Sequence, residues 1–198
     1  FLFNESKRKA VRDKLGIDEN TTAFLSVGRI SFQKNQIKAL DIFSAYKKTI
    51  NNNSIMYLYG DGDIKELIQK SESLKLTQNK DVFFKKATKK INEIYNAFDI
   101  FLFPSVFEGM GLSFIEAQLN GLACLGSTAI DPTFLISKKA NLLDLKIPSN
   151  VWAKNINGLL ADKRRSFDSI KAKNIKFLSY DNFIDSIDLV YKSFLDSK

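Results

Sequence analysis

Residues 101–118 read Phe-Leu-Phe-Pro-Ser-Val-Phe-Glu-Gly-Met-Gly-Leu-Ser-Phe-Ile-Glu-Ala-Gln, and the most informative pattern in the sequence lies here. Its apolar start is typical of a strand buried on both faces, and Pro104 ends that strand because it has no amide to donate to a sheet. A turn with Gly109 and Gly111 follows, and apolar residues at helical spacing from Leu112 onward predict a helix. The sequence therefore predicts a strand, a glycine loop and a helix in direct succession.

The junction between this strand and this helix predicts a site for an anion. The first amides of a helix have no partner within it, and the helix dipole adds positive potential there. We therefore expect backbone N–H groups to face a ligand above the end of the strand. These groups belong to residues Met110 to Phe114, and Gly109, Met110, Gly111 and Leu112 are candidate donor-binding residues.

Two carboxylates, Glu108 and Glu116, flank the predicted anion site, with seven residues between them. Beside a bound phosphate, a carboxylate is better suited to accept hydrogen bonds from neutral hydroxyls of the same ligand than to contact the phosphate itself. A sugar nucleotide carries both kinds of group. The alternative is that both carboxylates only face solvent, one from a loop and one from a helix.

The motif Glu-Gly-Met-Gly-Leu-x-x-x-Glu-Ala at residues 108–117 resembles the donor-site signature of retaining glycosyltransferases of the GT-B fold. The resemblance is strongest to family 4, which includes capsular and lipopolysaccharide sugar transferases. It implies that Glu108 contacts hexose hydroxyls and that Glu116 contacts the ribose of a nucleoside-diphosphate sugar. It also implies sugar transfer with retention at the anomeric carbon.

A second strand, loop and helix junction lies earlier in the chain, where residues 23–27 predict a strand and residues 35–49 a helix. The loop between them carries Gly28, Arg29 and Lys34. A guanidinium and an ammonium can neutralise a leaving diphosphate without a metal. The resemblance implies this role for Arg29 and Lys34, whereas the alternative is two surface cations beside a turn.

Further strands are predicted at residues 55–59, 81–85, 121–127 and 141–145, with helices at 64–74 and 91–98. This alternation predicts an α/β fold, a Rossmann-like doubly wound parallel sheet that forms one half of a GT-B glycosyltransferase. A strand order of 3-2-1-4-5-6 would make the first and fourth strands neighbours. Both junctions would then meet at the carboxyl edge of the sheet, where ligands bind in such folds.

The loop after the third predicted strand reads Lys85-Lys86-Ala87-Thr88. In the resembled family this loop normally carries Gly and passes near the nucleotide base. Lys86 is therefore a candidate donor-binding residue, with a solvent-facing lysine as the alternative. This departure leaves the base undetermined.

The resemblance divides the chain into three parts. Residues 1–22 are expected to be a lead-in segment from a missing N-terminal acceptor domain, residues 23–162 the nucleotide-sugar donor-binding domain, and residues 163–198 C-terminal helices. GT-B enzymes react in the cleft between two domains, so we expect this chain alone to bind donor and to transfer sugar poorly.

The composition narrows the class of protein. The 198 residues are 44% hydrophobic, enough for one α/β domain, and the single Cys124 favours a reducing compartment. The 30 Lys and Arg against 22 Asp and Glu give a net charge of +8, which suits nucleic acid, an anionic membrane surface or an anionic small substrate. The sequence contains no histidine and no recognisable nucleic-acid module.

We therefore expect no metal or other cofactor and no nucleic-acid partner. The expected partners are an NDP-sugar donor, the acceptor domain and a polysaccharide or lipid-linked acceptor. The expected location is the cytoplasm, with peripheral membrane contact at its inner face in the full-length protein. Three alternatives stay open: a sugar-nucleotide epimerase of similar fold, a non-catalytic NDP-sugar-binding module, and a nucleic-acid-binding protein whose affinity falls steeply with salt.

Overall fold

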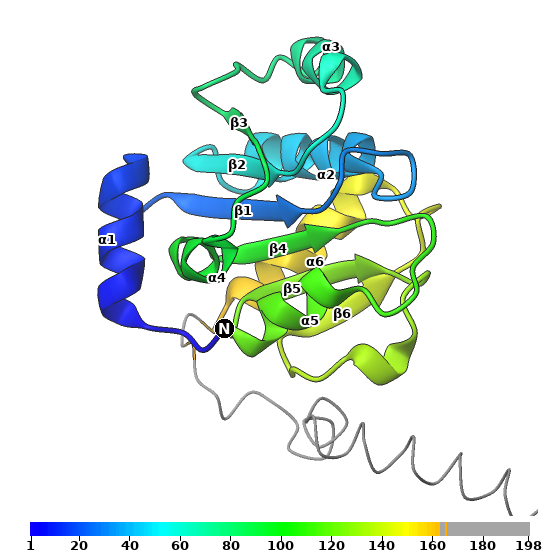
Figure 1. Ribbon diagram of the computed structural model, residues 1–198. Helices are drawn as coiled ribbons and strands as arrows, with labels where there is room; N and C mark the ends of the chain where they lie inside the picture. The colour runs from blue at the N-terminus through cyan, green and yellow to red at the C-terminus, as the bar shows by residue number, and fades with distance from the viewer. Residues whose placement is uncertain (163–164, 166–198) are drawn as a thin grey trace, which may run out of the picture.

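Six parallel strands form one sheet in the computed structural model, which describes residues 1–162 and 165 (Figure 1). The strand order is β3-β2-β1-β4-β5-β6, which confirms the predicted order. The strands are β1 (Thr22–Val27), β2 (Ser54–Tyr59), β3 (Val82–Lys85), β4 (Ile100–Phe103), β5 (Ala123–Ser127) and β6 (Ala140–Leu143). Their carboxyl ends all lie along one edge, because every pair in the sheet is parallel.

Helices cover both faces of the sheet, with α2 and α6 behind it and α4 and α5 in front in the view of Figure 1. The helices are α1 (Glu5–Leu15), α2 (Gln36–Thr49), α3 (Lys65–Ser73), α4 (Ile91–Ile94), α5 (Leu112–Leu119) and α6 (Ser149–Leu160), with short 3₁₀ turns η1 (Tyr95–Ala97) and η2 (Pro132–Phe134). The helix predicted at 91–98 is thus α4 followed by η1. The predicted C-terminal helices lie outside the described residues apart from Arg165, which is not helical. None of the described helices is long and apolar enough to span a membrane.

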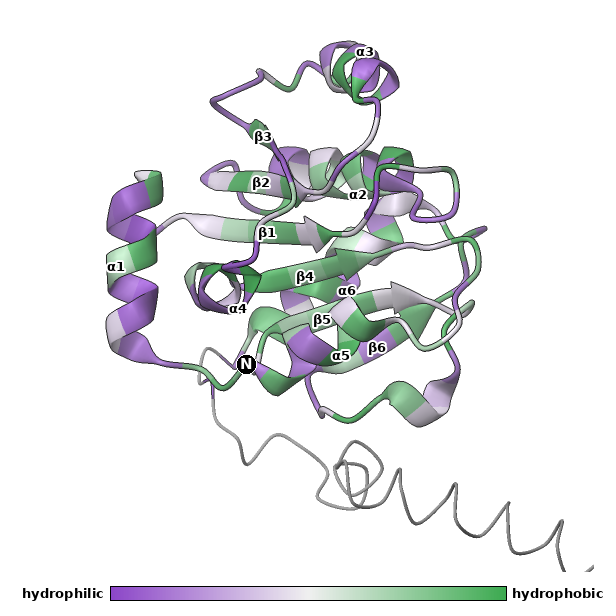
Figure 2. Cartoon of the chain, viewed as in Figure 1, coloured by the Kyte–Doolittle hydropathy of each residue, from purple (hydrophilic) through white to green (hydrophobic). Residues whose placement is uncertain are grey.

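Alternation along the central strands builds two apolar cores. Phe24 and Leu102 point to the α2 and α6 side, whereas Leu25 and Phe101 point to the α4 and α5 side. All four side chains are fully buried. Figure 2 shows apolar residues along β4 and β5, in keeping with strands buried on both faces.

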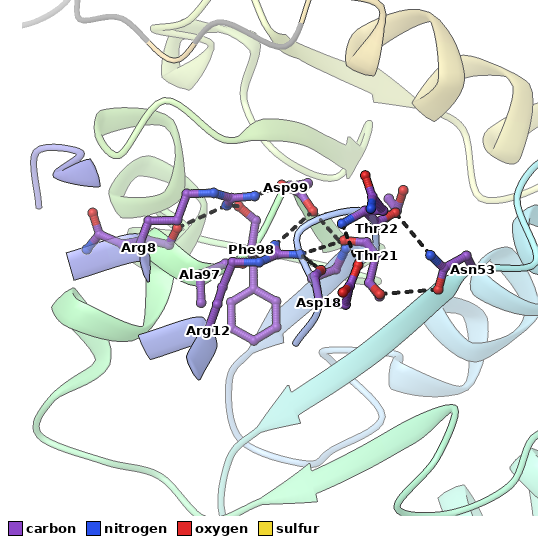
Figure 3. A network of polar contacts seen from close by, with 12 residues as sticks. Arg8, Arg12, Asp18, Thr21, Thr22, Asn53, Ala97, Phe98 and Asp99 are labelled. Carbon is purple, nitrogen blue, oxygen red and sulfur yellow. Dashed lines mark hydrogen bonds and ion pairs between the residues drawn. The ribbon is translucent and has the colours of Figure 1, made fainter. Parts of the chain in front are cut away.

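Helix α1 is fixed at the amino edge of the sheet by Arg12, a fully buried residue (Figure 3). Its guanidinium donates to the backbone oxygens of Ala97 at 2.8 Å and Thr21 at 2.7 Å, and also to that of Asp18. Three carbonyls from two separate segments therefore depend on one side chain. A buried charge with this many partners is costly to leave incomplete.

Asp99 completes the network at the start of β4. One of its carboxylate oxygens pairs with Arg8 at 2.8 Å, and the other lies 3.5 Å from Arg12 and accepts from the amide of Ala23 at 2.8 Å. Asp99, which directly precedes β4, thereby connects α1 to both β1 and β4. The segment predicted as a lead-in, residues 1–22, contacts the domain through these groups.

Replacing Arg12 should destabilise the fold strongly. We expect Arg12→Met to lower the free energy of unfolding by about 3 kcal/mol or more, because three carbonyls and part of Asp99 lose their donor in a buried place. Lys9→Met on the same helix, where the Lys9–Asp13 pair is exposed, should change it by less than about 0.5 kcal/mol. Urea denaturation of both variants measures the difference, and equal midpoints would show that the network contributes little.

Candidate functional site

The loops that follow β1 and β4 lie against each other at the carboxyl edge of the sheet. The amide of Val106 donates to the backbone oxygen of Gln33 at 2.7 Å. The side-chain amide of Gln33 donates in turn to the backbone oxygen of Phe107 at 3.1 Å. The two junctions identified in the sequence are therefore joined by hydrogen bonds, a contact that sequence patterns did not reveal.

Lys34 and Glu108 form an ion pair between these loops. The Lys34 Nζ lies 2.6 Å from Glu108 Oε1, although 74 positions separate the two residues. The side chains are 19% and 4% exposed, respectively, so both charges are largely removed from water. The ammonium also lies 4.6 Å from the centre of the Phe103 ring, a favourable contact for a cation. One predicted cation and one predicted carboxylate thus meet directly.

The side chain of Lys34 packs against the backbone of Gly28. A Cβ at Gly28 would lie 3.3 Å from Lys34 Cδ and Cε, and the backbone there has a φ of 156°. The methylenes of Lys34 therefore run across the bare backbone of Gly28 toward Glu108. A Cβ at this position would require the Lys34 methylenes to shift by a few tenths of an ångström, and residues with a side chain rarely adopt this φ.

Arg29 is exposed and borders a cavity of about 230 Å³ at the carboxyl ends of β1 and β2. Its backbone oxygen is held by the side-chain amide of Gln36 at 2.9 Å. Within the described part of the chain, its guanidinium makes no hydrogen bond or ion pair, so its donors are open to a ligand. The cavity is lined by Val27, Gly28, Arg29, Tyr59, Gly60, Asp61, Ala87, Thr88 and Ile91.

Helix α5 begins with open amides. Gly111 precedes it in the left-handed conformation, with a φ of 65°, and no side chain caps the helix. The backbone N–H groups of Leu112 and Ser113 have no partner among the described residues, and the first turn holds no acidic residue. The expectation of an open amide was wrong for Phe114, whose N–H donates to the backbone oxygen of Gly111 at 2.8 Å because the first turn of the helix already closes there. Gly109, Met110 and Leu112 are exposed around them. This helix start has the geometry and polarity that an anion requires.

Glu116 lies one turn into α5 and is held by Tyr95 rather than by the loop cations. The Tyr95 hydroxyl donates to Glu116 Oε2 at 3.0 Å. Burial raises the pKa of Glu116 above its ordinary value, and the hydrogen bond from Tyr95 partly opposes this. No direct contact joins Glu116 to Arg29, Lys34 or Glu108 within the described residues. Tyr95 falls within the helix predicted at residues 91–98, but nothing in the sequence indicated its contact with Glu116.

Lys86 is exposed in the loop after β3. Its neighbours Ala87 and Thr88 line the cavity beside Arg29, whereas Lys86 does not. The amide of Ala87 donates to Asp61 Oδ1 at 3.3 Å, which fixes the loop beside β2. Lys86 therefore stands at the margin of the site.

A larger cavity, of about 810 Å³, lies at the amino edge of the sheet, where Arg8 and Asp99 are among its lining residues. None of the ten residues predicted from the sequence lines it. The smaller cavity, the open amides of α5 and the Lys34–Glu108 pair share the carboxyl edge, so we take that edge as the candidate site. Among the residues that the structure describes, no three His, Cys, Asp or Glu side chains gather as a metal site would require.

The chain is similar in sequence to a family of known proteins. The family described as "Glycosyl transferases group 1" matches residues 7–183. The UDP-Gal:alpha-D-GlcNAc-diphosphoundecaprenol alpha-1,3-galactosyltransferase of Escherichia coli is 27% identical over 188 residues, which are 92% of this chain and 47% of that protein. The capsular polysaccharide biosynthesis glycosyltransferase CapH of Staphylococcus aureus is 28% identical over 171 residues, 82% of this chain and 46% of CapH. The chain thus spans less than half the length of these relatives.

A solved structure shows a similar fold. The crystal structure of HepE from Anabaena in complex with UDP and glucose matches with a TM-score of 0.75 and 22% sequence identity. The match covers 100% of this chain and 54% of HepE. At this identity the likeness concerns the fold, and it agrees with the predicted half of a GT-B enzyme.

The Lys34–Glu108 pair should show strong energetic coupling. In a double-mutant cycle with Lys34→Met and Glu108→Gln, we expect a coupling free energy of about 1–3 kcal/mol, because both charges are largely desolvated. The same cycle on the exposed pair, with Lys9→Met and Asp13→Asn, should give about 0.5 kcal/mol or less. Chemical denaturation of the single and double variants provides both values, and similar coupling in the two pairs would contradict the burial argument.

The raised pKa of Glu116 predicts a pH-dependent stability difference. The folded protein holds the Glu116 proton more tightly than the unfolded chain does, so ionisation costs stability as pH rises from below the ordinary pKa of 4.5 through the folded value. Glu116→Gln cannot ionise. The melting temperature of the variant minus that of the parent should therefore increase between about pH 4 and about pH 7. Calorimetry across this range tests it, and a constant difference would mean that Glu116 ionises freely in the fold.

Proposed function

The chain belongs to the group 1 glycosyl transferases, and from that membership we propose that it is the donor-binding part of a retaining glycosyltransferase. Its donor would be a nucleoside-diphosphate sugar, from which the full enzyme transfers a hexose-type sugar to a polysaccharide or lipid-linked acceptor. The names of the relatives support this donor class, since one uses UDP-Gal and HepE was solved with UDP and glucose.

The observation that carries the proposal is the Lys34–Glu108 ion pair at 2.6 Å, beside the open amides of α5. This one edge combines a cation, a carboxylate and unpartnered N–H groups. An activated sugar has the matching groups, namely a diphosphate and neutral hydroxyls. A phosphate alone or a sugar alone matches only part of this set.

Arg29 and Lys34 would stabilise the leaving group. In the reaction the bond between the anomeric carbon and the diphosphate oxygen breaks, and its electron pair stays on the diphosphate. The acceptor oxygen bonds to the same carbon, and its proton passes to the departing diphosphate. Negative charge therefore grows on the diphosphate, where the two cations and the amides of Leu112 and Ser113 would lower the barrier.

The remaining predicted residues would shape the donor pocket. Glu108 would accept from hexose hydroxyls and Glu116 from the ribose. Gly28, Gly109 and Gly111 would let the backbone approach the donor, with Met110 and Leu112 around it, and Lys86 would lie toward the nucleotide. No metal or other cofactor is part of this proposal, because two cations and a helix start supply the positive charge.

The acceptor would bind to a second domain of a longer protein. The chain spans 47% of the Escherichia coli relative, whose name includes a diphosphoundecaprenol-linked sugar. We therefore propose a two-domain enzyme in the cytoplasm that works at the inner face of the membrane. Its acceptor and linkage would be set by the part of the enzyme outside this chain.

Titration with nucleotides tests the proposed donor site. We expect UDP or another nucleoside diphosphate from a panel of UDP, GDP, ADP and dTDP to bind. Arg29→Ala should weaken that binding by about tenfold or more, because one charge-assisted contact to phosphate is worth about 1.5–3 kcal/mol. Lys80→Ala removes one charge from an exposed lysine at the amino end of β3, so it should change affinity less than about twofold. Isothermal titration calorimetry measures both.

Two results would count against the proposal. Equal losses for Arg29→Ala and Lys80→Ala would mean that only the overall charge attracts nucleotides. Binding by none of the panel would remove the donor site altogether. In the two-domain enzyme, a change of sugar configuration without an acceptor would instead identify an epimerase.

A further inference from the structure

The hydroxyl of Tyr95 lies within hydrogen-bond distance of two oxygens of helix α5. It lies 3.0 Å from Glu116 Oε2 and 3.2 Å from the backbone oxygen of Ser113. Glu116 Oε1 has no hydrogen-bond partner within the described residues. The carboxylate therefore has one oxygen held by the protein and one oxygen free.

Tyr95 is well suited to hold that oxygen in a fixed place. Its side chain is fully buried, and its ring packs at 5.9 Å from that of Phe101 in β4. A buried aromatic ring has little rotational freedom, so the hydroxyl position is set by the core. By contrast, the Glu116 side chain has several rotatable bonds and needs an external contact to choose one orientation.

A second contact relates this group to the cavity beside Arg29. The Ser113 hydroxyl donates to the backbone oxygen of Val27 at 3.2 Å, and Val27 lines the cavity. Ile91, four positions before Tyr95, lines the same cavity. The segment that carries Tyr95 thus borders the space in which we place the nucleotide, and the helix that carries Glu116 contacts a residue that lines this space.

We propose that Tyr95 is a positioning residue that holds Glu116 Oε2 and leaves Oε1 as the acceptor for the ribose hydroxyls of the donor. This inference rests on the proposed function and extends it to a residue outside the signature motif. It predicts selectivity for ribose over deoxyribose. When a hydroxyl is missing from the ligand, a fixed and partly buried acceptor is left unpaired, whereas a loosely held carboxylate can turn toward water.

The experiment compares two buried tyrosines. Tyr95→Phe removes the hydroxyl at Glu116, and Tyr57→Phe removes a hydroxyl that donates to the backbone oxygen of Leu15 at 3.4 Å, away from the site. Calorimetric titration of the chain with UDP and with 2′-deoxy-UDP gives the affinity ratio for the parent and each variant. If another nucleoside diphosphate binds more tightly in the panel, it and its 2′-deoxy form replace them.

We expect the parent to prefer the ribonucleotide by about tenfold, Tyr95→Phe to lower that preference to about twofold, and Tyr57→Phe to leave it unchanged. Glu116→Ala should abolish the preference, and adding Tyr95→Phe to it should have no further effect on the ratio. This non-additivity is a result that a general loss of stability would not give.

The outcomes separate this inference from the proposed function. If Tyr95→Phe weakens both ligands equally and keeps the ratio of the parent, Tyr95 is a structural residue and the inference is wrong, while the donor site stands. If the parent shows no preference for ribose, the role of Glu116 falls together with that of Tyr95. If the parent binds no nucleoside diphosphate, the proposed function itself is overturned.

Discussion

The parallel pairing of β1 with β4 is the constraint on which the rest of the structure depends. Phe24 pairs with Ile100 and Leu25 with Phe101 in the middle of the sheet. Because the strands are parallel, their following loops must leave from the same edge and side by side. Lys34 and Glu108 meet for this reason, and no local feature of either loop would bring them together.

The two edges of this strand pair differ in how fully their polar groups are partnered. At the amino edge, the buried Arg12 reaches three carbonyls, and Asp99 has Arg8, Arg12 and an amide as partners. At the carboxyl edge, the guanidinium of Arg29 and the first amides of α5 have no partner among the described residues. The partnered groups at the amino edge stabilise the fold, although the buried Arg12 Nε has no hydrogen-bond partner in the described part of the chain. The open groups at the carboxyl edge are available to a ligand.

Local patterns in the sequence were enough for the strands, and the order typical of a doubly wound fold then predicted the edge at which the candidate residues gather. Buried strands and glycine loops leave such patterns because burial and backbone conformation restrict residue type at each position. The hydrogen bond from Tyr95 to Glu116 and the link from Gln33 to Phe107 leave none. Contacts of this kind depend on side-chain orientation across elements, which no period along the chain records. For the same reason the sequence could not show that Lys86 lies outside the lining of the cavity.

The Lys34–Glu108 pair keeps two largely buried charges stable in the absence of a ligand. Each charge neutralises the other at 2.6 Å, so neither is left unpaired before the ligand arrives. An ammonium has three donors and Glu108 takes one of them, while Glu108 Oε2 has no partner among the described residues. A diphosphate can therefore approach Lys34 while a sugar hydroxyl approaches Glu108, and the pair need not separate. A ligand with only a phosphate or only hydroxyls would leave either Glu108 Oε2 or the remaining donors of Lys34 without a partner. In the proposed function, the pair would thus favour ligands that carry phosphate and hydroxyls close together.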